Sequence, residues 1–436
     1  MRNRSEQRLL KHANKKDRGN TPRVIIICVL SVLTMAAVLW FVGTVIDTLG
    51  DLSQVRPQAP VDRFDDPRHY GYTEEPDIPD PELLPPAPGV VLTGINYIEA
   101  GGSFELPLQG ATGWASARIH MRATPGAHGQ SLRLLTPGQG FTILDVSGHW
   151  WYVELPEGET GWVANNGTLI NLPDIIPSII YNITNAAASV KRSYGFNIPG
   201  ITGVRLYNAR AYNPRLGREE YIVPSAYQMA HALFAVQQMA LSEGNTLIVY
   251  EVFRPAAAQA AVVAGMTTLM EQNHEVNTVM TTPPWHLGWF ISTGVSHHQL
   301  GAAVDATLAG VHFYEYRQTG DFIYRHIVEH VRHRMPSRMH ELSPWAAIFD
   351  TPRTVTAAQI LNDNVRMSVY VTDATRDMQR YMATAGLNPL ASEWWHFSHP
   401  ASISAVSGLG VNGNFFTETV YSRPPVLNDN ESETEE

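Results

Sequence analysis

Cysteine is almost absent from this sequence. Of the 436 residues only Cys28 is a cysteine, and it stands inside an apolar run. The rest of the chain therefore has no disulfide, no thiolate nucleophile and no cysteine metal ligand. Any metal site must be built from histidine and carboxylate side chains.

The chain also lacks an excess of positive charge. Its 31 Lys and Arg residues are outnumbered by 41 Asp and Glu residues, which gives a formal net charge of −10. A nucleic-acid partner is therefore not expected. Hydrophobic residues make up 44% and charged residues 17% of the chain, which is typical of a folded protein. The length indicates two or three folded units.

One long run without charge lies near the N-terminus. Residues 24–46 read VIIICVLSVLTMAAVLWFVGTVI, and about 20 apolar residues span a bilayer as a helix. Residues 1–23 are rich in Lys and Arg, whereas Asp47 and Asp51 follow the run. The positive-inside rule then predicts a single-pass membrane anchor with a cytoplasmic N-terminus and the bulk of the chain outside the cell. A cleaved signal peptide and a buried core helix are the alternatives.

Two stretches have compositions that do not build a core. Residues 47–107 include the segment PDIPDPELLPPAPG, whose proline and acidic residues favour extended conformations and predict a linker. Residues 425–436 end in a run of acidic residues and predict a disordered tail.

Short β-type runs alternate with turns over residues 108–173. Gly and Pro separate runs such as GFTILDV, HWWYVEL and TGWVA, a pattern that predicts a small all-β barrel. The residues that carry a family resemblance are Met121-Arg122 before a turn, Gly138 before a strand, the Trp150-Trp151 pair and Gly161-Trp162-Val163. On these residues the region resembles a bacterial SH3-like domain. The resemblance implies a cell-wall ligand or a plain spacer, with Trp150, Trp151 and Trp162 as the candidates for an exposed aromatic.

The largest unit is expected over residues 185–424, with mixed helices and strands. Ser225 is placed to cap a helix that runs to Leu241. The run Thr246–Val252 (TLIVYEV) is typical of a buried strand. Pro255 suits the first turn of an alanine-rich helix, and Asp373 is placed to cap a further helix.

Two segments of this unit carry side chains suited to metal chemistry. The first, at 296–305, reads SHHQLGAAVD, and the second, at 393–397, reads EWWHF. Zinc in a hydrolase takes three protein ligands of nitrogen or oxygen type and keeps one open position. His298, Asp305 and His396 could supply these ligands. Glu393 could then act as the base that takes a proton from water.

Together the two segments resemble the zinc D-Ala-D-Ala peptidases, a family that includes vancomycin-resistance dipeptidases, D,D-carboxypeptidases and some phage endolysins. The resemblance implies an α+β zinc peptidase domain, an antiparallel sheet with flanking helices. It implies Zn²⁺ ligation by His298, Asp305 and His396, with Glu393 as catalytic base. A Phe-Arg-Pro sequence at 253–255 matches a further motif of the family, in which the arginine, here Arg254, stabilises the tetrahedral intermediate.

Two further residues are candidate substrate contacts. Ser296 begins the first motif. Asp350 ends an Ile-Phe-Asp sequence, the remnant of a segment with which the dipeptidases hold the substrate amino group. The reduced segment and the expected external location favour a D,D-carboxypeptidase that acts on D-Ala-D-Ala ends of peptidoglycan stem peptides. A D-Ala-D-Ala dipeptidase, a peptidoglycan endopeptidase and a catalytically dead wall-binding protein are the alternatives.

Some features of the sequence leave the site ambiguous. His297 adjoins His298, so spacing alone could shift the ligand by one position. The segment 325–333 (RHIVEHVRH) places two histidines four residues apart, which would share one face of a helix. In a regular strand residues three apart face opposite ways, so Glu393 and His396 can face one ion only if the backbone bends.

Overall fold

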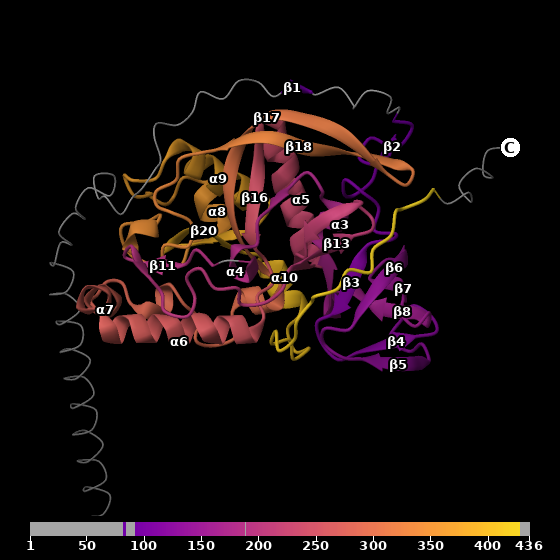
Figure 1. Ribbon diagram of the computed structural model, residues 1–436, viewed down its shortest axis with the longest axis horizontal. Helices are drawn as coiled ribbons and strands as arrows, with labels where there is room; N and C mark the ends of the chain where they lie inside the picture. Colours follow the sequence, from indigo (N-terminus) through magenta and orange to yellow (C-terminus); the bar gives the residue numbers. More distant parts are fainter. Residues whose placement is uncertain (1–81, 84–91, 188, 428–436) are drawn as a thin grey trace, which may run out of the picture. The chain divides into compact units, whose positions relative to one another are not determined.

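Two β-sheets dominate the computed structural model of the protein (Figure 1). The structure describes residues 82–83, 92–187 and 189–427, all within one unit that runs from Arg63 to Glu436. The strands of the first sheet are β1 (Glu82–Leu83), β2 (Ile95–Asn96), β10 (Ile180–Tyr181), β16 (Asn245–Glu251), β17 (Ala303–Thr319), β18 (Phe322–Arg332), β19 (Asn388–Leu390) and β20 (Glu393–Ser398).

This sheet is mixed, which corrects the antiparallel sheet expected from the sequence. Its main path is β10-β16-β17-β18-β2, with β1 and β20 also pairing with β17. Strands β16, β17, β18 and β20 pair antiparallel, whereas β1, β2 and β10 each join the sheet in parallel. The parallel strands are only two residues long and come from segments without alternating apolar residues. Their sequences therefore gave no strand signal.

The centre of the sheet is formed by β16 and the first half of β17. Nearly every residue of these two stretches is buried, which explains why their sequences are continuously apolar rather than alternating. Helices α5 (Tyr227–Ser242) and α9 (Asp373–Thr384) pack on β16 and β17. The other helices and 3-10 turns are α3 (Leu172–Ile175), α4 (Thr184–Ala187), α6 (Ala256–Gln272), α7 (His274–Thr281), α8 (Ala357–Leu361), α10 (Pro400–Ala405), η1 (Asn165–Gly167), η2 (Leu287–Trp289), η3 (His297–Leu300) and η4 (Pro344–Ala346).

The second sheet replaces the self-contained barrel that the sequence predicted. Its strand order is β15-β9-β3-β6-β7-β8-β4-β5. The edge strand β15 comes from the larger region and pairs with β9, so the chain leaves the small region and returns to it. The strands are β3 (Thr112–Ala115), β4 (Ile119–Arg122), β5 (Ser131–Leu135), β6 (Gly140–Ser147), β7 (Trp150–Glu154), β8 (Thr160–Ala164), β9 (Thr168–Asn171) and β15 (Pro224–Ala226). Two hairpins complete the described elements: β11 (Arg192–Ser193) with β12 (Phe196–Asn197), and β13 (Arg210–Asn213) with β14 (Arg218–Tyr221).

One hydrophobic core runs through both regions. Trp151 of β7 is fully buried, and its ring meets that of Tyr227 of α5 edge-on with centroids 5.2 Å apart. Trp151 belongs to a buried cluster that also contains Val249 of β16, and Tyr227 packs against that cluster. Trp150 and Trp162 remain partly exposed, so of the three candidate aromatics Trp151 is the core residue.

The C-terminal segment, residues 411–427, links the two sheets (Figure 1, yellow). Near its start, the side-chain amide of Gln299 donates to the Asn412 carbonyl oxygen at 2.6 Å. Farther on, the hydroxyl of Thr142 in β6 donates to the Tyr421 carbonyl oxygen at 2.6 Å, and the Tyr421 amide donates to Thr112 Oγ1 at 2.8 Å. The segment therefore fixes the loop before β17 and the second sheet at once.

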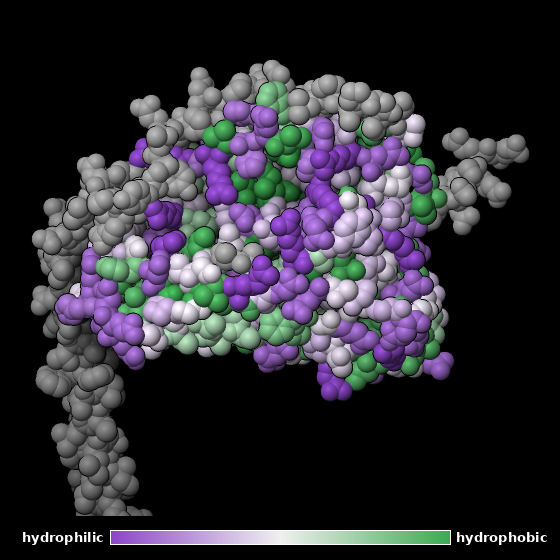
Figure 2. Space-filling view, in the orientation of Figure 1, coloured by the Kyte–Doolittle hydropathy of each residue, from purple (hydrophilic) through white to green (hydrophobic). Residues whose placement is uncertain are grey.

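Helix α6 begins at Ala256 and carries a single charged residue, Glu271. Its outward positions Ala257, Ala260 and Ala264 are exposed, and the surface along this helix is pale green in Figure 2. The buried side of α6 includes Val262 and other apolar side chains that contact the core.

The predicted single-pass anchor and the extracellular location derived from it are not supported. In the part of the chain that the structure describes, no helix has both the length and the apolar character needed to cross a bilayer. The longest helix described, α6, has 17 residues, and about 20 are needed. Residues 24–46 lie outside the described part of the chain.

The segment 325–333 is a strand rather than the helix that two histidines four apart would suit. Residues 325–332 form the second part of β18, where pairing with β17 overrides the helical spacing. His326 is half-buried beside Arg218, with His326 Nδ1 and Arg218 Nη1 3.2 Å apart. Burial, Arg218 and Arg317 lower the pKa of His326 to about 3.

This shift predicts a pH-dependent contribution to stability. The unfolded chain protonates His326 below about pH 6.5 while the folded chain does not, so stability is lost as the pH falls from there towards 3. For this partly exposed group we expect a loss on the order of 1–2 kcal/mol between pH 7 and pH 4. His326→Gln should remove that component from urea unfolding curves, and His128→Gln, at an exposed position, should not. Equal pH slopes for His326→Gln and the parent protein would contradict the assignment.

Candidate metal centre

Pairing of three strands brings the predicted site residues side by side. Asp305, the third residue of β17, lies opposite Glu251 of β16 on one side and opposite His396 of β20 on the other. His298 lies on η3, the turn that leads into β17. The spacing of the first motif therefore follows from one tight turn and the first residues of a buried strand.

Gly301 makes that turn possible. It ends η3 in the left-handed conformation, with φ of 65°, which favours glycine. A Cβ atom at this position would lie 2.7 Å from Leu169 Cδ2 of β9 and 3.0 Å from the Ala226 amide nitrogen of β15. A side chain at this position would therefore press on the Leu169 side chain and on the backbone of β15.

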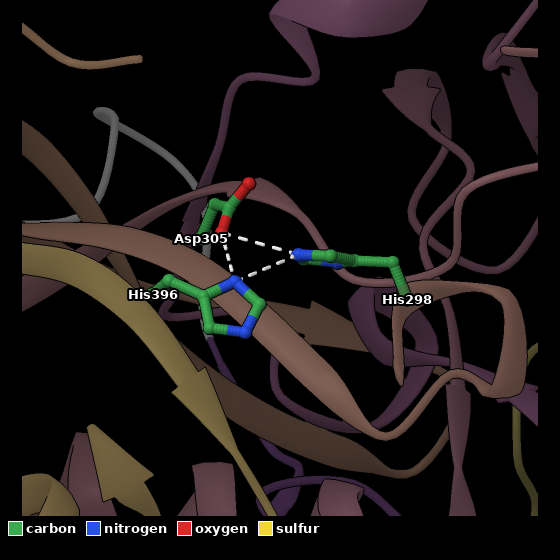
Figure 3. A group of neighbouring side chains, drawn as sticks. All are labelled: His298, Asp305 and His396. Atoms are coloured by element: carbon green, nitrogen blue, oxygen red, sulfur yellow. Dashed lines mark hydrogen bonds and ion pairs between the residues drawn. The ribbon is translucent and has the colours of Figure 1, made fainter. Parts of the chain in front are cut away.

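His298, Asp305 and His396 converge at single atoms (Figure 3). His298 Nε2 lies 3.0 Å from His396 Nδ1 and 3.2 Å from Asp305 Oδ1. The third side of the triangle, from His396 Nδ1 to Asp305 Oδ1, is also 3.0 Å. Among the described residues these three form the one group of His, Cys, Asp and Glu side chains with the spacing of a metal site.

The hydrogen bonds behind the triangle orient the two imidazoles. His298 Nδ1 is 2.9 Å from the Val252 carbonyl oxygen, which can only accept, so this nitrogen carries the proton. In the neutral ring Nε2 then presents a lone pair to the centre. His396 Nε2 is 3.2 Å from Ser398 Oγ, which leaves Nδ1 facing the centre. Partners of this kind orient histidine ligands in metal sites.

The donor set fits a zinc ion. With Zn–N and Zn–O bonds of about 2.0–2.1 Å, neighbouring ligand atoms of a tetrahedral site are about 3.3–3.4 Å apart. The three measured separations, 3.0, 3.0 and 3.2 Å, are close to that edge. Two nitrogens and one oxygen leave a fourth position for water or substrate, as hydrolytic sites require.

The outer oxygen of Asp305 is held from the opposite side. Oδ2 lies 3.2 Å from His340 Nε2 and 3.4 Å from Arg254 Nη2. Burial by itself would raise the pKa of Asp305, but the surrounding histidines hold that pKa well below its usual range. His340 is fully buried and has a left-handed backbone, with φ of 59°, a conformation that costs free energy and is often kept at functional sites.

Arg254 follows β16 and is also clamped by its neighbours. Its Nε donates to Glu251 Oε2 at 2.8 Å, and its Nη2 donates to the same oxygen. Nη1 donates to Gln259 Oε1 at 2.6 Å. Burial alone would lower the pKa of Arg254, but Glu251 raises it, so the guanidinium stays charged.

Glu393 reaches the same centre because of a bulge. Leu390 of β19 pairs with Glu393, but Pro389 pairs with Phe397, so β20 carries extra residues between these two pairs. The irregularity lets residues three apart face one side, and Glu393 Oε2 lies 3.9 Å from His396 Nδ1. Burial and the charge of Asp305 raise the pKa of Glu393 to about 8.

These side chains lie at a cavity of about 350 Å³. Glu393, His298 and His396 line it, as do Arg254 and Ser296. The Ser296 hydroxyl is buried and has no hydrogen-bond partner in the described part of the chain. Apolar walls come from the segment 288–292, which follows α7, and from Val355 and Ile403.

Two further residues singled out in the sequence, Asp350 and His297, are not part of the triangle. Asp350 is exposed and does not line the cavity, so its position does not support the predicted contact with a substrate amino group. Its buried neighbours Ile348 and Phe349 turn into the core and leave Asp350 outside. His297 lines the cavity, but its Nδ1 is 2.8 Å from Ser398 Oγ and it is not part of the metal-like group. His298 is therefore the member of the pair that joins it.

Four polar residues of the site were missed by sequence reasoning. Glu251 lies three residues before Arg254 and Gln259 five residues after it. This closeness to Arg254 in the sequence could have marked both as members of the site. His340 and Lys191 lie in segments with no periodicity and no motif, so nothing local distinguishes them. Burial of their polar side chains becomes visible only in three dimensions.

Loss of any one member of the triangle should abolish tight metal binding. We expect His298→Ala, Asp305→Ala and His396→Ala each to weaken zinc binding by more than about 100-fold, since even the residues behind metal ligands are worth about 10- to 100-fold. Zinc content after dialysis and competition with a chromophoric chelator measure this. His297→Ala is the matched control and should keep one zinc per chain. Unchanged zinc affinity in the three variants would contradict the assignment of these residues as a metal centre.

Comparison with known proteins identifies one part of the chain. Residues 117–169 match the bacterial SH3 domain family, which confirms the SH3-like resemblance of that region. No peptidase family matches the chain, and no curated protein matches it either. What is established by comparison is therefore that this chain contains a bacterial SH3 domain at residues 117–169.

Proposed function

We propose that this protein is a zinc-dependent metallopeptidase that removes the terminal D-alanine from D-Ala-D-Ala ends of peptidoglycan stem peptides. The observation that carries the proposal is the convergence of His298, Asp305 and His396 beside Glu393 at one cavity. The substrate class comes from the motif resemblance, and the site geometry suits the hydrolysis of an amide bond.

The residues of the site would have separate roles in this reaction. Bound zinc supplies Lewis acidity, which makes water acidic near neutral pH and polarises a carbonyl group. Glu393 takes the proton of the attacking water and delivers it to the leaving amine. Its buried position keeps bulk water from competing for that proton. His298, Asp305 and His396 remain fixed through the cycle by their outer hydrogen bonds.

Arg254 can contribute one hydrogen bond to the oxyanion of the tetrahedral intermediate. A guanidinium has five N–H donors. Contacts with Glu251, Gln259 and Asp305 occupy both N–H groups of Nη2, the Nε–H and one N–H of Nη1. The remaining Nη1–H is on a residue that lines the cavity, and a fixed donor of this kind stabilises developing negative charge.

The cavity suits a stem peptide better than a free dipeptide. A free dipeptide carries an ammonium group, which needs a carboxylate partner. Among the described residues that line the cavity, Glu393 is the one carboxylate, and it has the role of base. Asp350, the expected ammonium partner, lies outside the cavity. A blocked, amide-linked D-Ala-D-Ala end has no such charge to satisfy.

The bacterial SH3 domain is compatible with a cell-wall partner. Trp162 and Tyr152 are partly exposed on adjacent strands, with ring centroids 5.2 Å apart, and exposed aromatic pairs suit peptide or sugar contacts. Because this domain shares a core with the larger region, wall binding would bring the catalytic cavity close to its substrate.

Glu393→Gln tests the proposed chemistry. We expect it to lower kcat by about 10²- to 10⁴-fold, the usual contribution of a general base, while zinc stays bound. The assay incubates the zinc-loaded full chain with a wall pentapeptide that ends in D-Ala-D-Ala, beside free D-Ala-D-Ala, and identifies products by mass.

Release of one alanine from the pentapeptide, absent in Glu393→Gln, would support the carboxypeptidase. Cleavage of the free dipeptide alone would indicate a dipeptidase, and an internal cut would indicate an endopeptidase. No cleavage of either compound by the parent protein would overturn the proposed function.

Asp350→Asn separates the carboxypeptidase from the dipeptidase by mutation. Because Asp350 is exposed and away from the cavity, we expect kcat/KM on the pentapeptide to stay within about twofold of the parent value. A large rise in KM for free D-Ala-D-Ala with no change for the pentapeptide would restore an ammonium-binding role for this residue.

A further inference from the structure

A second cation lies at the cavity beside Arg254. Lys191, between α4 and β11, lines the cavity although it is only 3% exposed. In the described part of the chain its ammonium group makes no hydrogen bond and no ion pair. The carboxylates of Glu251, Asp305 and Glu393 attract this ammonium group without forming an ion pair with it. A buried charge without a hydrogen-bonded partner is costly, so its retention at a cavity points to a partner that arrives from outside the chain.

The backbone of Lys191 is held firmly on both sides. Its amide donates to Ser189 Oγ at 3.3 Å, and its carbonyl oxygen accepts from the hydroxyl of Thr202. The next amide, that of Arg192, donates to the carbonyl oxygen of His340 at 3.0 Å. Because His340 also holds Asp305, the backbone beside Lys191 is tied to the metal centre by two hydrogen bonds in series.

The other cation of the cavity is not free to bind an anion in the same way. Four of the five N–H groups of Arg254 are used within the protein, so it cannot offer the two parallel hydrogen bonds with which arginine recognises a carboxylate. Lys191 retains all three of its donors. Ser296, with an unpartnered hydroxyl at the same cavity, could add a neutral hydrogen bond.

We propose that Lys191 binds the C-terminal carboxylate of the substrate and thereby makes the cavity specific for chain ends. The inference rests on the proposed peptidase function and adds a specificity-determining residue to it. An ammonium group without an internal partner favours a carboxylate over a C-terminal amide or a continuing peptide bond. Lys191 thus selects terminal over internal D-alanine, while Arg254 remains the donor to the oxyanion.

The test compares an N-acetylated pentapeptide that ends in D-Ala-D-Ala as a free acid with its C-terminal amide. Zinc-loaded full chain carrying Lys191→Met should lose about 10- to 100-fold in kcat/KM on the acid, mainly through KM, and little on the amide. Lys191→Arg should restore much of the preference for the acid. Arg192→Met, which removes the neighbouring cation that does not line the cavity, is the matched control and should behave as the parent protein.

A binding measurement separates this inference from the proposed function. Calorimetric Kd values for the acid and the amide are taken in Glu393→Gln with and without Lys191→Met, and zinc content is measured in each protein. We expect the double variant to lose the preference for the acid while it keeps its zinc. Equal losses for acid and amide, or an unchanged preference for the acid, would overturn the role of Lys191. The parent protein could also fail to cleave the pentapeptide while its preference for the acid still depends on Lys191. This result would overturn the proposed peptidase function and support Lys191 as a carboxylate-binding residue.

Discussion

The two oxygens of one buried carboxylate hold the candidate site together. Asp305 is 1% exposed, and a charge at such a position is tolerated only when it is fully paired. One oxygen faces His298 and His396, and the other meets His340 and Arg254. Each of these partners comes from a different segment of the chain. The position of the side chain therefore depends on the whole central sheet, and the metal-like triangle depends on that position.

The fold was predictable where burial acts over a long segment. The continuously apolar run Thr246–Val252 predicts a buried strand, and β16 occupies nearly the same residues. Short elements were not predictable, because strands of two or three residues carry too few side chains to show a period. Ser225 illustrates this: it was assigned as a helix cap, yet it lies in β15, where pairing with β9 decides its conformation. The pairing of β15, a strand of three residues, with β9 of the SH3-like region was not predictable for the same reason.

The candidate site was likewise predictable from the sequence only in part. His298 and Asp305 of the candidate metal centre could be identified from the sequence, because a short turn and the start of a strand are local features that set the spacing between them. The common orientation of Glu393 and His396 was not predictable, since it needs a bulge that only the pairing with β19 creates. Lys191 has no local signature at all. Its importance comes from burial and from the absence of an internal partner, which are properties of the assembled fold.

The hydrogen bonds made by residues 412 and 413 set the order in which the site can be completed. Asn412 accepts from the side chain of Gln299, within the loop that carries His298, and the Gly413 carbonyl oxygen accepts from the amide of Ala256. Every candidate ligand and the candidate base, Glu393, precede these residues in the chain. During translation the reactive side chains are therefore synthesised before the residues that fix their loop, so the site can reach its finished geometry only after residues 412 and 413 have left the ribosome.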